Sequence, residues 1–401
     1  MFHALIAGFA AAVLAAGEAP PTLTLEQALA QARTGLAEAR LAVDLAELEA
    51  DLGQTRGLLR EGPSLATQAG WRRQSPDGDG ADFGLEIELP LASKASRAGR
   101  ASLADALGAS RETLGRAAAA TDRQKIVEAY LALWGAQRRA ALRQDDERLL
   151  REFAGRLREQ IAAGAVAAFH SGLIDAELRA AQGLAAEALA EEGLAWAKLL
   201  ALADLPAVPI PWLERPSWTA AAPAEPQASP APAGPGSLVA ESLRAEQRLA
   251  DSRSLWSQSR QLSRSGVAAS LAREGDEDVV LVGWRWRIPF EGERQALERR
   301  TAGEISLREI AARQQLAELE GRRRSSRALL AALPAGAEDP QRLEAVWQAA
   351  ELRVREGKDS PAEAMSIRRA LISAQITALD LELRRLAAQA ELAYLSLETR
   401  P

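Results

Sequence analysis

The chain has 401 residues, enough for two or three ordinary domains, and its 55 Asp and Glu outnumber its 49 Lys and Arg. This mildly acidic balance excludes the basic surface that nucleic-acid binding needs, and the absence of cysteine excludes disulfides, thiol catalysis and zinc–thiolate sites. The two histidines, His3 and His170, are far apart and His170 has no second histidine near it, so we predict no metal site and no cofactor.

The first residues have the pattern of a secretory signal peptide. Residues 4–16 are apolar, rich in Ala and end in small residues, and residues 17–19 (GEA) offer a cleavage site, so we assign residues 1–19 to the signal. This run is shorter than the ~20 residues of a membrane-spanning helix. Because no Lys or Arg precedes it, the first helix of a cytoplasmic protein is the alternative. No later apolar stretch is long enough for such a helix, so any membrane insertion would have to use β-strands.

After the signal, we expect a helix that begins at Thr24 and continues to about Leu59. Thr24 caps it and forms a capping box with Gln27. A β-hairpin follows, with strands at 63–73 and 81–90 joined by a turn rich in Gly and Asp. Pro90 ends the second strand, because proline cannot donate a hydrogen bond to the ladder.

A very long helix follows the hairpin. Residues 91–205 contain no proline and are rich in Ala, Leu, Arg, Glu and Gln, which favour helix. Gly164 and the small residues around it predict a single turn at 164–172, so the preceding helix spans about 92–161, roughly 105 Å at 1.5 Å per residue. That length exceeds a compact domain and indicates a coiled coil or a helical barrel.

The second half has the same order of elements. Nine prolines within residues 206–235 predict an irregular connector, which separates a first repeat (20–205) from a second (236–401). A second hairpin, with strands at 263–273 and 278–289, precedes another long helix. We expect Pro334 and Pro340 to interrupt that helix, and a turn at 357–361 to follow. The last helix has a seam spaced by three and four residues and broken only at Arg385: Ile367, Leu371, Ala374, Ala378, Leu381, Ala388, Leu392 and Leu395.

The strand that ends each hairpin repeats position by position. Residues 83–91 read FGLEIELPL and residues 282–290 read VGWRWRIPF, so Pro90 aligns with Pro289. The apolar residues of both strands alternate with charges, which are Glu86 and Glu88 in the first strand and Arg285 and Arg287 in the second.

The strands have the length and alternation of transmembrane β-strands, with the apolar face suited to lipid and the charged face to a lumen. Two hairpins supply only four strands, so several copies would be needed to close a barrel. The strands at 81–90 and 278–289 run in the same direction and cannot be antiparallel neighbours, so we expect their charges to form rings of opposite sign. The alternatives are a small soluble sheet on a helical stalk and, for the charges, an ordinary solvated wall.

The chain from about Leu23 to its end resembles the TolC-like outer-membrane efflux proteins. The repeat of strand, Pro and long helix is similar to that family's, as are the opening LTLEQAL at 23–29 and the turn REGKDSPAEA at 355–364, which is like that of metal-exporting members. The first turn departs from the pattern because it lacks the usual Ser and Asp.

This resemblance implies a mainly helical fold, in which long coiled-coil helices form a periplasmic α-barrel and two β-hairpins per chain join a trimeric 12-stranded barrel in the outer membrane of a Gram-negative bacterium. It implies a passive conduit, not an enzyme, that works with a periplasmic adaptor and an inner-membrane pump, with metal ions, drugs and polypeptides open as cargo. The two turns would form the periplasmic tip for docking and gating, through Gly164, Asp175, Gly357, Lys358, Asp359, Ser360, Pro361 and Glu363. For each tip charge the alternative is an ordinary exposed residue on a coiled coil. For the whole chain it is a periplasmic coiled-coil scaffold or adaptor without a pore.

Overall fold

The computed structural model describes residues 22–33, 35–54, 64–75, 78–207, 210–216, 237–262, 264–274, 277–287, 290–333 and 340–397. The predicted signal peptide and most of the connector lie outside these residues. The chain divides into two compact units, which are described separately. The helical unit comprises Met1–Gly35, Ala120–Pro230 and Arg322–Ser396, and the strand unit comprises Leu36–Ala119, Ala231–Gly321 and Leu397–Pro401.

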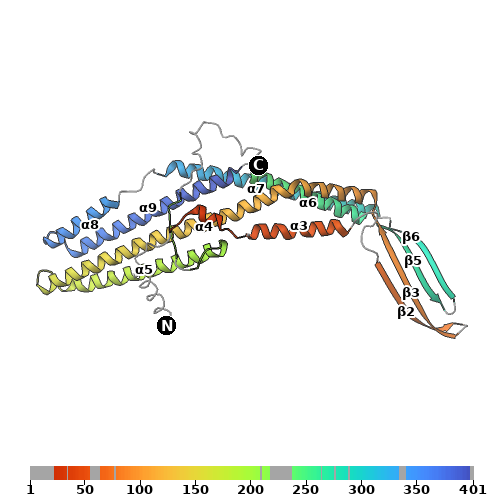
Figure 1. Cartoon of the computed structure of the whole chain (residues 1–401), viewed down its shortest axis with the longest axis horizontal. Coiled ribbons are helices and arrows are strands. Elements are labelled where there is room, and N and C mark those ends of the chain that lie inside the picture. Colours follow the sequence, from red (N-terminus) through yellow and green to blue (C-terminus); the bar gives the residue numbers. More distant parts are fainter. Residues whose placement is uncertain are drawn as a thin grey trace. The chain divides into compact units, whose positions relative to one another are not determined.

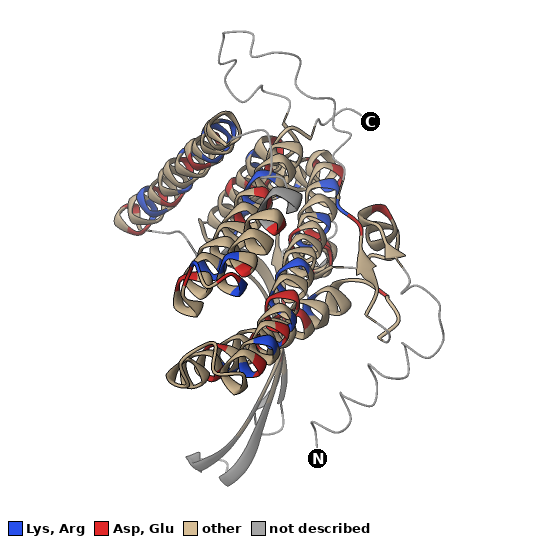
Figure 2. Cartoon of the chain, turned by 90° about the vertical axis from the view of Figure 1, so that its left-hand side faces the viewer, with Lys and Arg blue, Asp and Glu red and all other residues tan. Residues whose placement is uncertain are grey.

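The helical unit is built from two helical hairpins. The long helix α4 (Lys94–Ala162) enters it from the strand unit, and α5 (Phe169–Leu202) folds back along it (Figure 1). The second hairpin consists of α8 (Pro340–Arg355) and α9 (Pro361–Leu395). The 69 residues of α4 confirm the predicted long helix, since they correspond to about 104 Å at 1.5 Å per residue. Acidic and basic residues are interspersed along the helices (Figure 2).

In the helical unit, a cluster of buried side chains holds the start of the first repeat beside the start of the connector. Tyr130 on α4 is fully buried, and its hydroxyl lies 2.8 Å from the carbonyl oxygens of Leu23 and Glu214. These acceptors flank β1 (Thr22–Leu23) and β4 (Trp212–Leu213), which pair in parallel. Burial raises the pKa of Tyr130 above its usual range, so its hydroxyl remains a donor.

The expected irregular connector therefore contains a short ordered segment. Gln137 on α4 donates from its amide nitrogen to Pro211 O (2.8 Å) and accepts from Leu213 N–H (3.0 Å). One buried side chain thus satisfies a backbone carbonyl just before β4 and a backbone N–H within it, which fixes the start of the connector against α4.

The predicted first helix was wrong in its extent, although its start is confirmed. Thr24 and Gln27 form the expected capping box at α2, but α2 (Leu25–Ala30) ends after six residues and α3 (Leu36–Gln54) is a separate helix. The break is tertiary in origin, because Arg33 N–H donates to Leu202 O (3.1 Å) and Asp204 N–H donates to Gln31 O (2.8 Å). These bonds to the end of α5 replace the helical hydrogen bonds that continuation would require.

The strand unit contains both predicted β-hairpins. The first is β2 (Ser64–Ser75) with β3 (Gly78–Leu91), and the second is β5 (Arg264–Glu274) with β6 (Glu277–Arg287). They join into one antiparallel sheet in the order β2-β3-β5-β6 (Figure 1). Beside the sheet, α3, the start of α4 and α6 (Leu238–Leu262) bury a common set of Leu side chains and Trp256.

The second long helix is interrupted, as Pro334 and Pro340 predicted. Helix α7 (Glu291–Ala332) ends before the first proline, and α8 begins at the second. In the predicted seam of α9, Leu371, Ala388 and Leu395 are buried and the other members are half-buried. None of the described helices is both long and apolar enough to cross a membrane.

Candidate functional site

The register of the sheet sorts its residues onto two faces of different chemistry. Because successive side chains alternate between faces, residues paired across strands share a face. One face is mainly apolar. Three of its rows of paired residues are Leu65, Ile87, Ala269 and Val282; Thr67, Leu85, Leu271 and Val280; and Leu89, Val267 and Trp284. The row nearer the hairpin turns pairs Phe83 with Arg273 and Arg273 with Asp278, so charged positions occur there.

The opposite face carries the four charged positions singled out in the sequence. Glu86 pairs with Ala66 and Ser270, and Glu88 pairs with Ser64 and Ala268. Their rows continue to Leu281 and Gly283 on β6, and the alternation from there places Arg285 and Arg287 on the same face. The side chains of these two arginines lie outside the described residues, so only their register is assigned.

The apolar face of the sheet is exposed. Val280, Val282 and Trp284 on the apolar face are 67%, 74% and 59% exposed, although such residues are usually buried. Glu86 and Glu88 on the polar face are half-buried. An exposed apolar face of this kind indicates a surface that another molecule or a lipid phase covers.

The predicted ends and neighbours of the two charged strands, β3 and β6, are confirmed in part. Pro90 is buried at the end of β3, opposite Gly266, whereas Pro289 lies outside the described residues. β3 pairs with β2 and β5 and not with β6, so the two charged strands are not neighbours in this sheet. β2 and β6 are its edges.

Both predicted turns begin with the same backbone motif, which ends the preceding helix. Gly164 has φ +75° and Gly357 has φ +68°, a left-handed conformation that favours glycine. In the first turn Gly164 N–H donates to Ile161 O (3.0 Å) and Ala165 N–H donates to Gln160 O (2.9 Å). The equivalent bonds in the second turn run from Gly357 to Val354 O (3.0 Å) and from Lys358 to Arg353 O (2.9 Å), which is the Schellman pattern of helix ends.

The charged residues predicted at the tip lie in local ion pairs. In the second turn Asp359 accepts two bonds from Arg353, at 2.7 and 2.8 Å, and Lys358 lies 2.7 Å from Glu356. Ser360 caps α9, with Pro361 as the first helical residue and Glu363 completing a capping box. Behind the first turn, Asp175 on α5 pairs with Arg158 on α4.

A buried ion pair behind the turns was missed by the sequence reasoning. Arg368 on α9 donates from Nε to Asp146 Oδ1 on α4 (2.7 Å), and both side chains are 8% exposed. The Arg368 guanidinium lies 5.5 Å from the Trp347 ring centre, and Phe153 contacts that ring edge-on. The sequence pattern could have indicated that Arg368 is buried, because it falls on the same helical stripe as the buried Ala364 and other apolar residues of α9.

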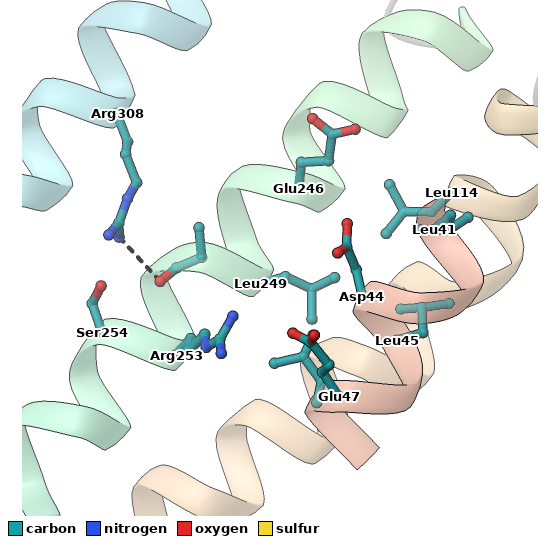
Figure 3. A pocket seen from close by; sticks show the side chains of 12 residues that line it. Leu41, Asp44, Leu45, Glu47, Leu114, Glu246, Leu249, Arg253, Ser254 and Arg308 are labelled. Carbon is teal, nitrogen blue, oxygen red and sulfur yellow. Dashed lines mark hydrogen bonds between the residues drawn. The ribbon is translucent and has the colours of Figure 1, made fainter. Parts of the chain in front are cut away.

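A groove of about 470 Å³ lies in the strand unit, between α3, α4, α6 and α7 (Figure 3). Leu45 and Leu249 line its apolar part, and burial raises the pKa of Glu246 at its edge. Arg308 is held by its bond to Ala250 O (3.0 Å) and its ion pair with Asp251. Within the described part of the chain, no group of three or more His, Cys, Asp or Glu side chains could hold a metal ion, and that includes this groove.

Comparison with known proteins matches the chain by fold. No family model matches, and no curated protein is similar in sequence. Among solved structures, the CmeC outer-membrane channel of Campylobacter jejuni matches with TM-score 0.65 and 14% identity, over 94% of this chain and 87% of that one. The outer-membrane protein VceC of Vibrio cholerae matches with TM-score 0.65 and 15% identity, over 94% and 97%.

CusC, described for its transmembrane channel formation, matches with TM-score 0.62 and 16% identity, over 92% of this chain and 90% of that one. The chain therefore has the fold of these outer-membrane channels, over nearly its whole length. This confirms the predicted resemblance at the level of the fold.

Proposed function

We propose that this protein is the outer-membrane channel of a tripartite export system and carries cargo passively from the periplasm to the exterior. The observation that carries the proposal is the sheet: one exposed apolar face, one charged face and two edges, in a chain with an outer-membrane channel fold. A channel needs such a two-faced wall, because lipid covers one side and water fills the other.

The sheet also argues for a homotrimer. Four strands have two edges whose backbone groups would be unsatisfied in lipid, so the sheet has to close with other copies. Pairing β6 of one copy with β2 of the next, in three copies, makes a closed barrel of twelve strands with no free edge. The long helices would continue this barrel into the periplasm as a helical tunnel.

In this arrangement Glu86, Glu88, Arg285 and Arg287 line the lumen. The turns at Gly164 and Gly357 form the periplasmic tip, which docks on the adaptor beside the inner-membrane pump. The second turn offers Lys358, Asp359, Ser360, Pro361 and Glu363 for docking and gating, and the first offers Asp175 and the exposed Phe169 (73%). No catalytic step is required of any residue.

The test compares two neighbouring residues of β6 on opposite faces. Val282 is 74% exposed on the apolar face and Leu281 is 62% exposed on the polar face, so they differ mainly in orientation. Val282→Lys would place a charge in lipid, at a cost of about 2–4 kcal/mol near the bilayer midplane. Leu281→Lys would place it in water.

We expect the wild type and Leu281→Lys to be recovered from outer membranes as a heat-resistant trimer, and Val282→Lys to be depleted from that fraction. Recovery of the wild type as a soluble periplasmic monomer would support the scaffold without a pore. Equal recovery of the two variants would contradict the assignment of the faces.

A further inference from the structure

The charged face of the sheet is segregated by sign along the strands. At the end nearest the helices, Arg264 pairs with Arg287, and in the next row Gly266 pairs with Pro90 and Arg285. These two rows place three arginines at one end of the face. Their positions follow from backbone pairing alone.

The next rows carry the opposite sign. Glu88 lies one row beyond Arg285 and Glu86 one row beyond that, so the sign changes within about 7 Å along the strand. Near the hairpin turns the same face carries Glu274 paired with Glu277, and Asp82, with Arg72 as the basic exception.

Gly266 lies at the boundary between the two signs. A Cβ atom at this position would lie 3.3 Å from Glu88 Oε1 and 3.1 Å from Leu89 O. The carboxylate of Glu88 thus occupies the space above Gly266, in the row that also contains Arg285. The acidic zone therefore directly adjoins the basic one. By contrast, acidic and basic residues are interspersed along the helices (Figure 2).

We propose that Arg264, Arg285 and Arg287, together with Glu86 and Glu88, form a bipolar lining that makes ion flow through the channel depend on the sign of the voltage. The inference rests on the proposed trimer, in which each row becomes a ring around the lumen. The basic rings gather mobile anions and the acidic rings gather cations. One polarity drives both kinds of ion toward the boundary, where they accumulate and conduct, and the other polarity empties the boundary.

The direction follows from the order of the zones. The basic zone lies at the helix end and the acidic zone nearer the hairpin turns. Anions from the basic zone and cations from the acidic zone both move toward the boundary when the turn side is positive. The current is therefore larger with the turn side positive than with the helix side positive.

The experiment measures current against voltage for the full-length trimer in a planar bilayer. Protein is added to one chamber, which fixes the orientation because the charged helices stay on that side. In 0.01 M KCl, where the Debye length is about 30 Å, we expect a larger current with the far chamber positive. In 1 M KCl, with a Debye length of about 3 Å, the asymmetry should be lost.

An exchange variant separates this lining from every other charge in the protein. Replacing Glu86 and Glu88 by Arg, and Arg264, Arg285 and Arg287 by Glu, should reverse the favoured polarity. Glu86→Gln/Glu88→Gln should lose most of the asymmetry, and Arg285→Lys/Arg287→Lys, the matched control, should keep it.

The possible failures are distinguishable. The bipolar lining would be overturned if the wild type and the exchange variant favoured the same polarity. It would also be overturned if the glutamine variant kept its full asymmetry. Either result would leave the channel proposal intact. Membrane-inserted trimers that give no current steps in any variant would contradict the channel function itself.

Discussion

The two helical turns have the same backbone motif but begin their second helices by different means. After Gly164, α5 starts behind Ala168, which has helical dihedrals (φ −60°, ψ −25°) and makes no side-chain cap. After Gly357, α9 starts behind Ser360, which is extended (φ −79°, ψ +151°) and closes a capping box with Glu363. The second turn is thus held by its own side chains, whereas the first is held by its glycine and by packing between α4 and α5.

The difference also determines what each turn exposes. Residues 163–170 of the first turn contain no Asp, Glu, Lys or Arg and present Phe169, which is 73% exposed. The second turn is crowded with paired charges, including the two bonds from Arg353 to Asp359. A reverse bend between long helices therefore needs only the left-handed glycine, and the remaining positions are free to differ between the repeats.

The largest effect is expected from removing the buried ion pair between α9 and α4. Arg368→Met leaves Asp146 buried at 8% exposure without its partner, which should lower the free energy of unfolding by about 3–5 kcal/mol. Denaturant unfolding of the detergent-solubilised protein, followed by circular dichroism, measures it. Asp146→Leu added to Arg368→Met should recover most of the loss, because no charge is then left buried.

Arg369→Met is the matched control for that variant. Arg369 is the next residue and donates from Nε to Glu177 (3.0 Å), but its side chain is 64% exposed. Exposed pairs contribute at most about 1 kcal/mol, so this loss should be small. Equal losses of unfolding free energy for the two variants would show that the buried Arg368 pair contributes no more to stability than the exposed Arg369 pair.

The next effect tests what the two turns share. A Cβ atom at Gly164 or Gly357 would meet no atom within 4 Å, so the main penalty for valine is the left-handed backbone, about 1–2 kcal/mol at either site. Unfolding experiments should therefore give similar losses for Gly164→Val and Gly357→Val, and a smaller loss for Asn at each position. Under the proposed function Gly357→Val should also reduce export. A much larger loss at one turn would mean that the two are not equivalent.

The sequence was sufficient for features that depend on local pattern. Period-two alternation ending at Pro90 predicted β3, the absence of proline predicted α4, and the glycines predicted both turns. What the sequence could not supply depends on partners far along the chain. Arg33 bonds to Leu202 and ends α2, although no local signal at residues 31–35 excludes a continuous helix.

The candidate site likewise has a part that the local sequence pattern predicts and a part that depends on distant partners. Alternation alone placed Glu86 and Glu88 on one face, but only the observed pairing with Ser270 and Ala268 joins that face to the positions of Arg285 and Arg287. The Arg368–Asp146 pair spans 222 residues, and sequence spacing cannot identify which of the many carboxylates is the partner.

A smaller effect is expected where the turns differ in capping. Ser360→Ala removes the acceptor for Glu363 N–H and should cost about 1 kcal/mol, seen as faster hydrogen exchange in the first turn of α9. Ser360→Asp keeps an acceptor and should preserve protection. In the first turn, Ala168→Ser should add no protection, because the backbone at Ala168 is already helical. Increased protection of α5 in that variant would contradict the distinction between the turns.

The smallest effect is a pH dependence confined to the second turn. The Arg353 guanidinium lowers the pKa of Asp359, so this pair stabilises the turn fully above the unfolded value of about 4 and loses its effect as the pH falls through the lower folded value. Hydrogen exchange at residues 357–360 should therefore show increased local opening below pH 4, after correction for intrinsic rates. Asp359→Asn should remove this component, and Arg353→Gln should do the same. Residues 163–168 contain no carboxylate, so a parallel change there would show that acid loosens the helices generally and that the Asp359 pair is not its cause.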